Sequence, residues 1–205
     1  MATTKIDFKR EAKELYAPPR KPTMVDVPEF QFLMVDGMGD PNTSPDFHGA
    51  ANTLYTLAYI LKFTLKRTDG IDFVVAPLEG LWSMAGGEAF DSARPSDWRW
   101  TLMIRQPEEV TPAAFEQARA QAAHKAAADV LGRLRLERFE EGRCAQIMHI
   151  GPFATEGPTI HALHAFAEEQ GLQPYGRHHE IYLSDPRRMA PERMRTVLRQ
   201  PVRPR

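Results

Sequence analysis

Apolar residues recur three or four positions apart in a long segment that starts just after Ser44-Pro45. This spacing places them on one face of an α-helix. Serine caps helix N-termini well, and proline fits the first helical position. The turn residues Thr68-Asp69-Gly70 mark the end of the helix. The sequence therefore predicts a helix from Pro45 to about residue 68, with an apolar face made of Phe47, Ala50, Leu54, Leu57, Leu61 and Leu65.

Two further helices are predicted downstream. Thr111-Pro112 begins an alanine-rich segment that continues to about Leu131, where Gly132 ends it. A later segment, which ends before residue 171, again has apolar residues at helical spacing. Its inner face is predicted to contain Ile160, Leu163 and Ala167.

Runs of β-forming residues, bounded by turn residues, lie around these helices. The predicted strands are Phe30–Asp36, Ile71–Pro77, Trp98–Gln106, Cys144–Ile150, the segment around Glu180 and Arg195–Gln200. The order strand, helix, strand, strand thus occurs twice. Residues 105–107 and 199–201 also share the sequence Arg-Gln-Pro at matching positions of the two copies. Together these features indicate an internal duplication.

The predicted fold is therefore of the α+β class, with duplicated strand–helix–strand–strand modules related by a pseudo-twofold axis. Antiparallel sheets would surround a central cleft, and clefts between such halves commonly bind small molecules. Residues 1–28 are polar and weakly periodic, so we expect an arm that packs on the body. Residues 29–205 form a single domain in this interpretation. Its halves, about 29–110 and 133–205, are joined by the helix 111–131.

Charge and composition exclude several classes of protein. The 26 basic and 27 acidic residues balance, which gives no general attraction to nucleic acid or to a membrane surface. No run approaches the roughly 18 apolar residues of a spanning helix, and the N-terminus lacks a signal-peptide core. The single cysteine, Cys144, fits a reducing compartment. We expect a soluble cytoplasmic protein with no nucleic-acid or membrane partner.

The segment around Glu180 contains the most suggestive chemistry. Side chains alternate across a strand, so His178, Glu180 and Tyr182 share one face, whereas His179 and Ile181 point to the other, which we expect to be packed by aliphatic residues. An acid between an imidazole and a phenol suits a cationic or polarised planar ligand, or the activation of a water. The same pattern also fits the exposed polar face of an ordinary antiparallel sheet.

Aromatic residues and a second acid extend this set of candidates. Trp98 and Trp100 lie on one face of their strand, where they can belong to a core or to a pocket. Trp82 follows a glycine in a predicted loop, which favours a pocket. Tyr55 borders the apolar helix face and fits either role. Glu79, just after the second predicted strand, is either a second site acid or a solvated charge.

Metal and phosphate motifs are missing from the sequence. His161 and His164 have helical spacing, but no third ligand is suggested nearby and the common zinc patterns are absent. Glycine-rich phosphate loops are not matched either. We therefore expect no metal and no cofactor.

Three segments resemble a known family, the stand-alone GyrI-like small-molecule-binding proteins. They are Leu78–Trp82, Trp98–Pro107 and His178–Arg188, and the resemblance extends from about Lys5 to Pro201. It implies a duplicated strand–helix–strand–strand fold with a ligand cleft between the halves. Relatives act as effector-binding halves of multidrug-sensing transcription activators, in which a buried acid meets cationic aromatic ligands. Similar stand-alone members are implicated in hydrolysing cyclopropane-bearing alkylating natural products.

The resemblance assigns roles to individual residues. Glu180 corresponds to the cleft acid and would act as general base, with Tyr182 beside it as the second catalytic residue. The ligand-binding residues would be Trp82, Trp100, Tyr55, His178 and Glu79. One departure is Ser83, because the family often has a second aromatic residue at that position.

Three functions are compatible with these residues, and each expects a different kind of partner. The first is a cyclopropanoid cyclopropyl hydrolase, which would act on cyclopropane-bearing or other electrophilic xenobiotics, hydrophobic aromatic small molecules. The second is non-catalytic sequestration of hydrophobic cationic drugs. The third is a partner-binding protein of the gyrase-inhibitor type.

Overall fold

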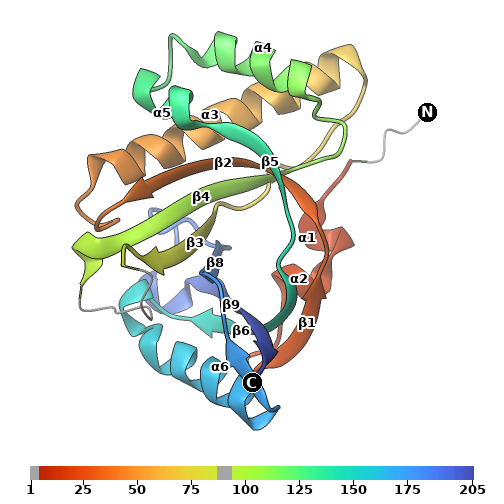
Figure 1. Ribbon diagram of the computed structural model, residues 1–205. Coiled ribbons are helices and arrows are strands. Elements are labelled where there is room, and N and C mark those ends of the chain that lie inside the picture. Colours follow the sequence, from red (N-terminus) through yellow and green to blue (C-terminus); the bar gives the residue numbers. More distant parts are fainter. Residues whose placement is uncertain (1–4, 87–93) are drawn as a thin grey trace.

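One antiparallel sheet organises the molecule, seen in a computed structural model that describes residues 5–86 and 94–205 (Figure 1). Within these residues the strand order is β1-β6-β9-β8-β3-β4-β2-β5, and β7 pairs with β9. The strands are β1 (Thr23–Val27), β2 (Phe30–Met38), β3 (Glu79–Met84), β4 (Trp98–Gln106), β5 (Arg135–Phe139), β6 (Gly142–Ile150), β7 (Leu172–Pro174), β8 (His178–Tyr182) and β9 (Arg195–Pro204). The helices are α1 (Phe8–Glu11), α2 (Lys13–Tyr16), α3 (Pro45–Thr68), α4 (Pro112–Ala122), α5 (Ala128–Arg133) and α6 (Gly157–Glu169), with short 3₁₀ turns η1 (Pro95–Asp97), η2 (Phe153–Thr155) and η3 (Pro191–Arg193).

The predicted α+β duplication is confirmed by the order of these elements. The first module is β2-α3-β3-β4 and the second is β6-α6-β8-β9. In the sheet the second module contributes β6-β9-β8 and the first contributes β3-β4-β2, which is the same order reversed. The two modules meet where β3 pairs with β8, and Gly80 lies directly opposite Glu180 at this junction.

Two edge strands cross between the modules. The strand that precedes the first module in the sequence pairs with the second module, and the strand that precedes the second module pairs with the first. β1 pairs with β6, and β5 pairs with β2. The N-terminal segment 1–28, expected to be an arm, therefore contributes a strand to the sheet. Its sequence Thr-Met-Val-Asp-Val contains the β-branched residues that favour an extended edge.

Helices α3 and α6 cover the same face of the sheet, one on each module (Figure 1). Leu54 of α3 belongs to the same core cluster as Leu102 of β4, and Leu163 of α6 packs with Leu198 of β9. Leu102 lies opposite Gly80, and Leu198 lies opposite Glu180. Directly opposite residues in an antiparallel pair project to the same side. The side chain of Glu180 therefore projects to this side, which we call the helix face, and the other side is the opposite face.

The start of α3 agrees with the sequence prediction. The Ser44 hydroxyl accepts a hydrogen bond from the backbone N–H of Phe47, and Pro45 is the first helical residue. Buried residues then follow along the helix at the predicted spacing. Among the described residues, no helix combines the length and the apolar composition that crossing a membrane requires.

The predicted strand at Ile71–Pro77 is wrong, because the strand is β3, at Glu79–Met84. Residues 71–78 form no strand and contain a single bridge, between Phe73 and Ile6. Lys62 pairs with Asp72 of this segment at 2.6 Å. β3 lies in the middle of the sheet, and five of its six residues are buried. A strand that is buried on both faces lacks the polar alternation that reveals an ordinary strand.

The predicted helix from residue 111 to 131 is two helices, α4 and α5. Thr111 caps the first as predicted, accepting a hydrogen bond of 3.1 Å from the N–H of Ala114. The buried residues of α4 are Phe115, Ala118 and Ala122, and the helix ends at the last of them. Alanine favours helix throughout this segment, so composition alone did not reveal the break.

Candidate functional site

Glu180 lies on the helix face at the junction of the two modules. The Tyr182 hydroxyl donates a hydrogen bond of 2.9 Å to Glu180 Oε2 and accepts one of 3.2 Å from Trp82 Nε1. A Cβ atom at Gly80 would lie 2.9 Å from both the Tyr182 oxygen and Trp82 Nε1. Glycine at this position therefore leaves room for the hydrogen-bonded chain Trp82–Tyr182–Glu180.

The electrostatics of these three hydrogen-bonded residues show which group donates the proton to Glu180. Burial, and then the negative charge of Glu180, raise the pKa of Tyr182 well above its ordinary value. Tyr182 is therefore a neutral phenol that donates its proton to the hydrogen bond. The Glu180 side chain is 13% exposed, and its other oxygen, Oε1, lies 3.6 Å from His178 Nε2.

Buried aromatic rings form one wall beside the acid. Phe47 of α3 stacks on Trp82 at 5.9 Å between ring centroids and meets Trp100 edge-on at 5.3 Å. Trp100 also fills the space above Gly37, where a Cβ atom would lie 2.0 Å from the indole. Trp82 and Trp100 are both almost fully buried, so they act as a core wall beside Glu180.

Tyr55 borders the same region from α3. Burial raises the pKa of its hydroxyl, which lies near the backbone of Leu78. The Leu78 carbonyl accepts a hydrogen bond of 3.0 Å from the N–H of Tyr182. The structure thus brings Tyr55 to the end of β8 that contains Tyr182.

A second carboxyl group, missed in the sequence, lies on the helix face. Glu156 immediately precedes α6, and its residue is 5% exposed. Phe153, three residues earlier, contacts the Tyr182 ring edge-on at 5.5 Å. Burial raises the pKa of Glu156 to about 9, and the negative charge of Glu180 adds to this effect. The signal that could have identified it is the duplication, because Glu156 precedes α6 as Ser44 precedes α3.

His149 and two threonines that flank Glu156 in the sequence form a group of hydrogen-bonded side chains. His149 Nδ1 lies 2.9 Å from the hydroxyl of Thr159, and its Nε2 lies 3.3 Å from that of Thr155. Burial lowers the pKa of His149. Thr196 of β9 lies opposite both His149 and Tyr182 in the sheet register. The helix face therefore contains two carboxyl groups, a phenol and a neutral imidazole.

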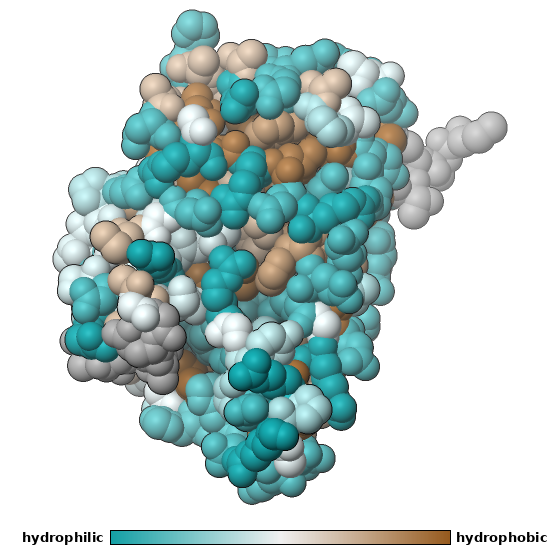
Figure 2. Space-filling model, in the orientation of Figure 1, coloured by the Kyte–Doolittle hydropathy of each residue, from teal (hydrophilic) through white to brown (hydrophobic). Residues whose placement is uncertain are grey.

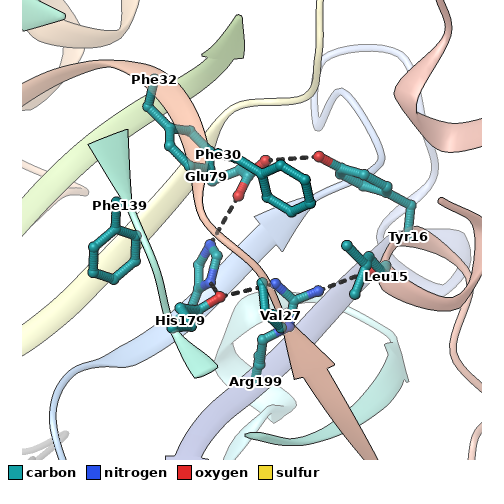
Figure 3. A pocket seen from close by; sticks show the side chains of 10 residues that line it. Leu15, Tyr16, Val27, Phe30, Phe32, Glu79, Phe139, His179 and Arg199 are labelled. Carbon is teal, nitrogen blue, oxygen red and sulfur yellow. Dashed lines mark hydrogen bonds and ion pairs between the residues drawn. The ribbon is translucent and has the colours of Figure 1, made fainter. Parts of the chain in front are cut away.

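Glu79 projects to the opposite face, so the structure does not bring it to Glu180. There His179 bridges two acids, at 3.0 Å from Glu79 and 2.9 Å from Glu141 (Figure 3). Arg199 pairs with Glu141 at 2.9 Å, and Tyr16 donates to Glu79 at 3.4 Å. We call these five residues the buried charge network. The prediction that His179 faces aliphatic side chains is wrong, because its partners come from remote parts of the chain.

The buried charge network fastens the N-terminal segment to the sheet. Arg199 donates to the backbone carbonyl of Leu15 at 2.8 Å, and Gln146 donates to that of Glu14 at 2.6 Å. The adjoining cavity is about 10 Å³ in volume and is lined in part by Phe30, Phe32 and Phe139 (Figure 3). Such a volume suits about one water molecule. We therefore assign this network to stability.

A larger hollow of about 340 Å³ lies between α4 and β5. Its lining residues are Pro112, Phe115, Glu116, Arg119, Leu134, Arg135 and Leu136. Figure 2 shows hydrophobic side chains exposed in this part of the surface. Neither hollow is lined by Glu180. Across residues 5–86 and 94–205, no three histidine, cysteine or acidic side chains are grouped so that they could hold a metal ion.

Comparison with known proteins gives a consistent result. Two solved structures from Listeria innocua are similar over nearly the whole chain. One, an uncharacterized conserved protein, is 48% identical with a TM-score of 0.89, and the match covers 97% of this chain and 100% of that one. The other, a hydrolase encoded by lin2189, is 45% identical with a TM-score of 0.86, and the match covers 98% and 100%.

A more distant structure shares the fold alone. The EcmrR C-terminal domain is 10% identical with a TM-score of 0.55, over 90% of this chain and 98% of that one. No curated protein matches the sequence. The family model described as a GyrI-like small molecule binding domain matches residues 20–203. The chain therefore belongs to the family of proteins with a GyrI-like small-molecule-binding domain.

Proposed function

We propose that the protein binds planar, electrophilic small molecules at the helix face and hydrolyses those that contain a cyclopropane, with Glu180 as the general base. The observation that carries this proposal is the hydrogen-bonded chain Trp82–Tyr182–Glu180. It fixes one carboxylate oxygen of Glu180 and leaves Oε1 to accept a proton from water. A positioned general base typically contributes about 10²–10⁴-fold to a rate.

The reaction suits a simple site. A cyclopropane fused to a dienone opens when water attacks a ring carbon, because strain is released and an aromatic ring forms. The base takes a proton from the attacking water, and negative charge appears on the distant oxygen. Exposed aromatic side chains near Glu180, such as Phe153 beside Tyr182, would hold a planar substrate by stacking, and the buried Trp82 would form the wall behind it.

The relative described as a hydrolase supports this proposal, since it is 45% identical over almost the entire chain. The partner we propose is accordingly a hydrophobic aromatic small molecule. We propose a cytoplasmic location, in keeping with a defence against such compounds.

Sequestration of hydrophobic cations is a second candidate. It is favoured by the two carboxyl groups of the helix face, Glu156 and Glu180. Among the described residues, neither forms an ion pair with lysine or arginine. A cationic ligand would supply the missing positive charge.

Glu180→Gln separates the two candidates, with the exposed Glu192→Gln as matched control. Ligand affinity and turnover of a duocarmycin-type alkylator would be measured on the same samples. Hydrolysis predicts that Glu180→Gln retains much of the affinity and loses about 10²–10⁴-fold in turnover. A wild-type protein that binds the compound without converting it would contradict hydrolysis. Loss of affinity for cations alone would favour sequestration.

A further inference from the structure

Glu156, the acid of the site that is protonated at neutral pH, is the residue for which a further role can be inferred. Glu156 is 5% exposed, and its Oε1 has no hydrogen-bond partner among the described residues. A buried carboxylate without a cation is strongly disfavoured, whereas the neutral acid is tolerated. An unpartnered carboxyl oxygen in such a place marks a position that a ligand can occupy.

The surroundings of Glu156 place it in the same cluster as Glu180. Its backbone N–H bonds to the carbonyl of Phe153, whose ring contacts Tyr182. Thr196 lies directly across the sheet from Tyr182, and its hydroxyl, like Glu156 Oε1, has no hydrogen-bond partner among the described residues. The titratable groups that interact with Glu156 are Glu180 and Tyr182 from β8, and His149 from β6 interacts with Glu180. None of them is a lysine or an arginine.

We infer that Glu156 is the proton donor of the proposed reaction and gives its proton to the carbonyl oxygen that is conjugated to the strained ring. This inference rests on the proposed function and adds to it a second catalytic group. Two carboxyl groups in different protonation states are a common basis for acid–base catalysis.

The step balances without any further reactant. The water oxygen forms a bond to the cyclopropane carbon, and the ring C–C bond breaks with its electron pair passing into the dienone. Glu180 takes one proton from the water, and Glu156 gives its proton to the carbonyl oxygen, which becomes a phenol. The product is the substrate plus one water, and a proton then returns from Glu180 to Glu156 through solvent.

Tyr182 is a poor alternative as donor. Its hydroxyl proton is already committed to Glu180 Oε2 at 2.9 Å. Burial, and then the charge of Glu180, also raise its pKa well above the ordinary value, so the phenol is a weaker acid than a free tyrosine. Glu156 has an acidic proton and no hydrogen-bond partner for Oε1 among the described residues.

An infrared measurement tests the protonation state without any need for turnover. Neutral carboxylic acids have a C=O stretching band distinct from that of carboxylates. At neutral pH the wild type, Glu180→Gln and the exposed control Glu169→Gln should share such a band, and Glu156→Gln should lack it. In the wild type and in Glu169→Gln, the band should disappear as the pH rises through about 9. Absence of the band at neutral pH would overturn the inference.

Turnover then tests the role as donor. Glu156→Gln should lower the hydrolysis rate of a cyclopropyl dienone by about 10²–10⁴-fold and flatten the alkaline decline of the pH–rate profile. The loss should be smaller for a substrate whose product is a more acidic phenol, because its oxygen needs the proton less. An unchanged rate, or an equal loss on both substrates, would overturn the inference. If the wild type hydrolyses nothing, the proposed function and the donor role fail together, whereas the infrared band still reports whether Glu156 holds a proton.

Discussion

The hydroxyl of Tyr182 lies 2.9 Å from Glu180 Oε2, on the same strand and two residues away. Strand geometry places both side chains on one face, and Gly80 on the neighbouring strand leaves the space that the hydroxyl occupies. A local pattern in one module and a glycine in the other therefore build the centre of the proposed site together.

Tyr182→Phe tests the donor to Glu180. The change removes the hydrogen bond to Glu180 Oε2 and leaves Trp82 Nε1 without its acceptor. We expect turnover to fall by about 10²-fold and the free energy of unfolding to fall by about 1 to 3 kcal/mol. Steady-state kinetics and urea unfolding measure the two effects. Tyr59→Phe, on an exposed part of α3, is the control and should change neither.

Gly80→Ala tests the space at the module junction. The new Cβ atom would lie 2.9 Å from the Tyr182 oxygen and from Trp82 Nε1, so both side chains must move. We expect a loss of stability of about 1 to 3 kcal/mol, together with weaker ligand binding. Calorimetry would measure both. Gly132→Ala has no atom within 4 Å of the added carbon and should have little effect; similar losses in the two variants would contradict the prediction.

Glu141→Gln tests the buried charge network. The substitution leaves Arg199 and His179 buried without the carboxylate that both contact at 2.9 Å. Removing one partner of a buried ion pair costs about 3 to 5 kcal/mol, because the remaining charge is not compensated. Denaturant unfolding is the measurement, and the exposed neighbour Glu140→Gln is the control. Equal stability of the two variants would show that the network contributes little.

The same network predicts how stability depends on pH. Burial favours neutral Glu141, but the charges of His179 and Arg199 outweigh it and lower its pKa from 4.5 to about 2. Its contribution is therefore present above about pH 4.5 and is lost as the pH falls toward 2. Burial opposes the charged form of His179, but Glu141 and Glu79 raise its pKa above 6.5. That contribution is present below pH 6.5 and is lost as the pH rises through the raised value.

Melting temperatures across acid and alkaline pH would test this dependence. The wild type should be most stabilised by the network between about pH 4.5 and 6.5. The stability difference between the wild type and Glu141→Gln should shrink on the acid side, because protonation of Glu141 has the same effect as the substitution. A difference that stays constant down to the pH of acid unfolding would contradict the assigned charges.

Local rules predicted much of the fold and the strand face on which the proposed site lies. The Ser44 and Thr111 caps, the α3 face and the shared face of Glu180 and Tyr182 all depend on residues close in sequence. The position of β3 was predicted wrongly because a central strand lacks alternating apolar and polar residues. The need for glycine at residue 80 follows only from its contact with Tyr182, which the sequence does not show.

The missed residues depend on contacts between distant parts of the chain. Glu141 and His179 are 38 residues apart, and Glu141 and Arg199 are 58 apart. Glu156 meets its cluster only because η2 folds over the end of β8, where Phe153 contacts Tyr182. The charge at each of these positions could be read from the sequence, but its partner could not.

Turnover in isotopically labelled water shows whether the protein is a hydrolase. Purified wild-type protein would be incubated with an excess of a cyclopropyl dienone in water enriched in oxygen-18, and the products would be followed by mass spectrometry. If Glu180 is the general base of a hydrolase, we expect many product molecules per protein, each with one labelled oxygen, and a large loss of this product with Glu180→Gln. Recovery of unchanged substrate, or product formed no faster than without protein, would contradict it.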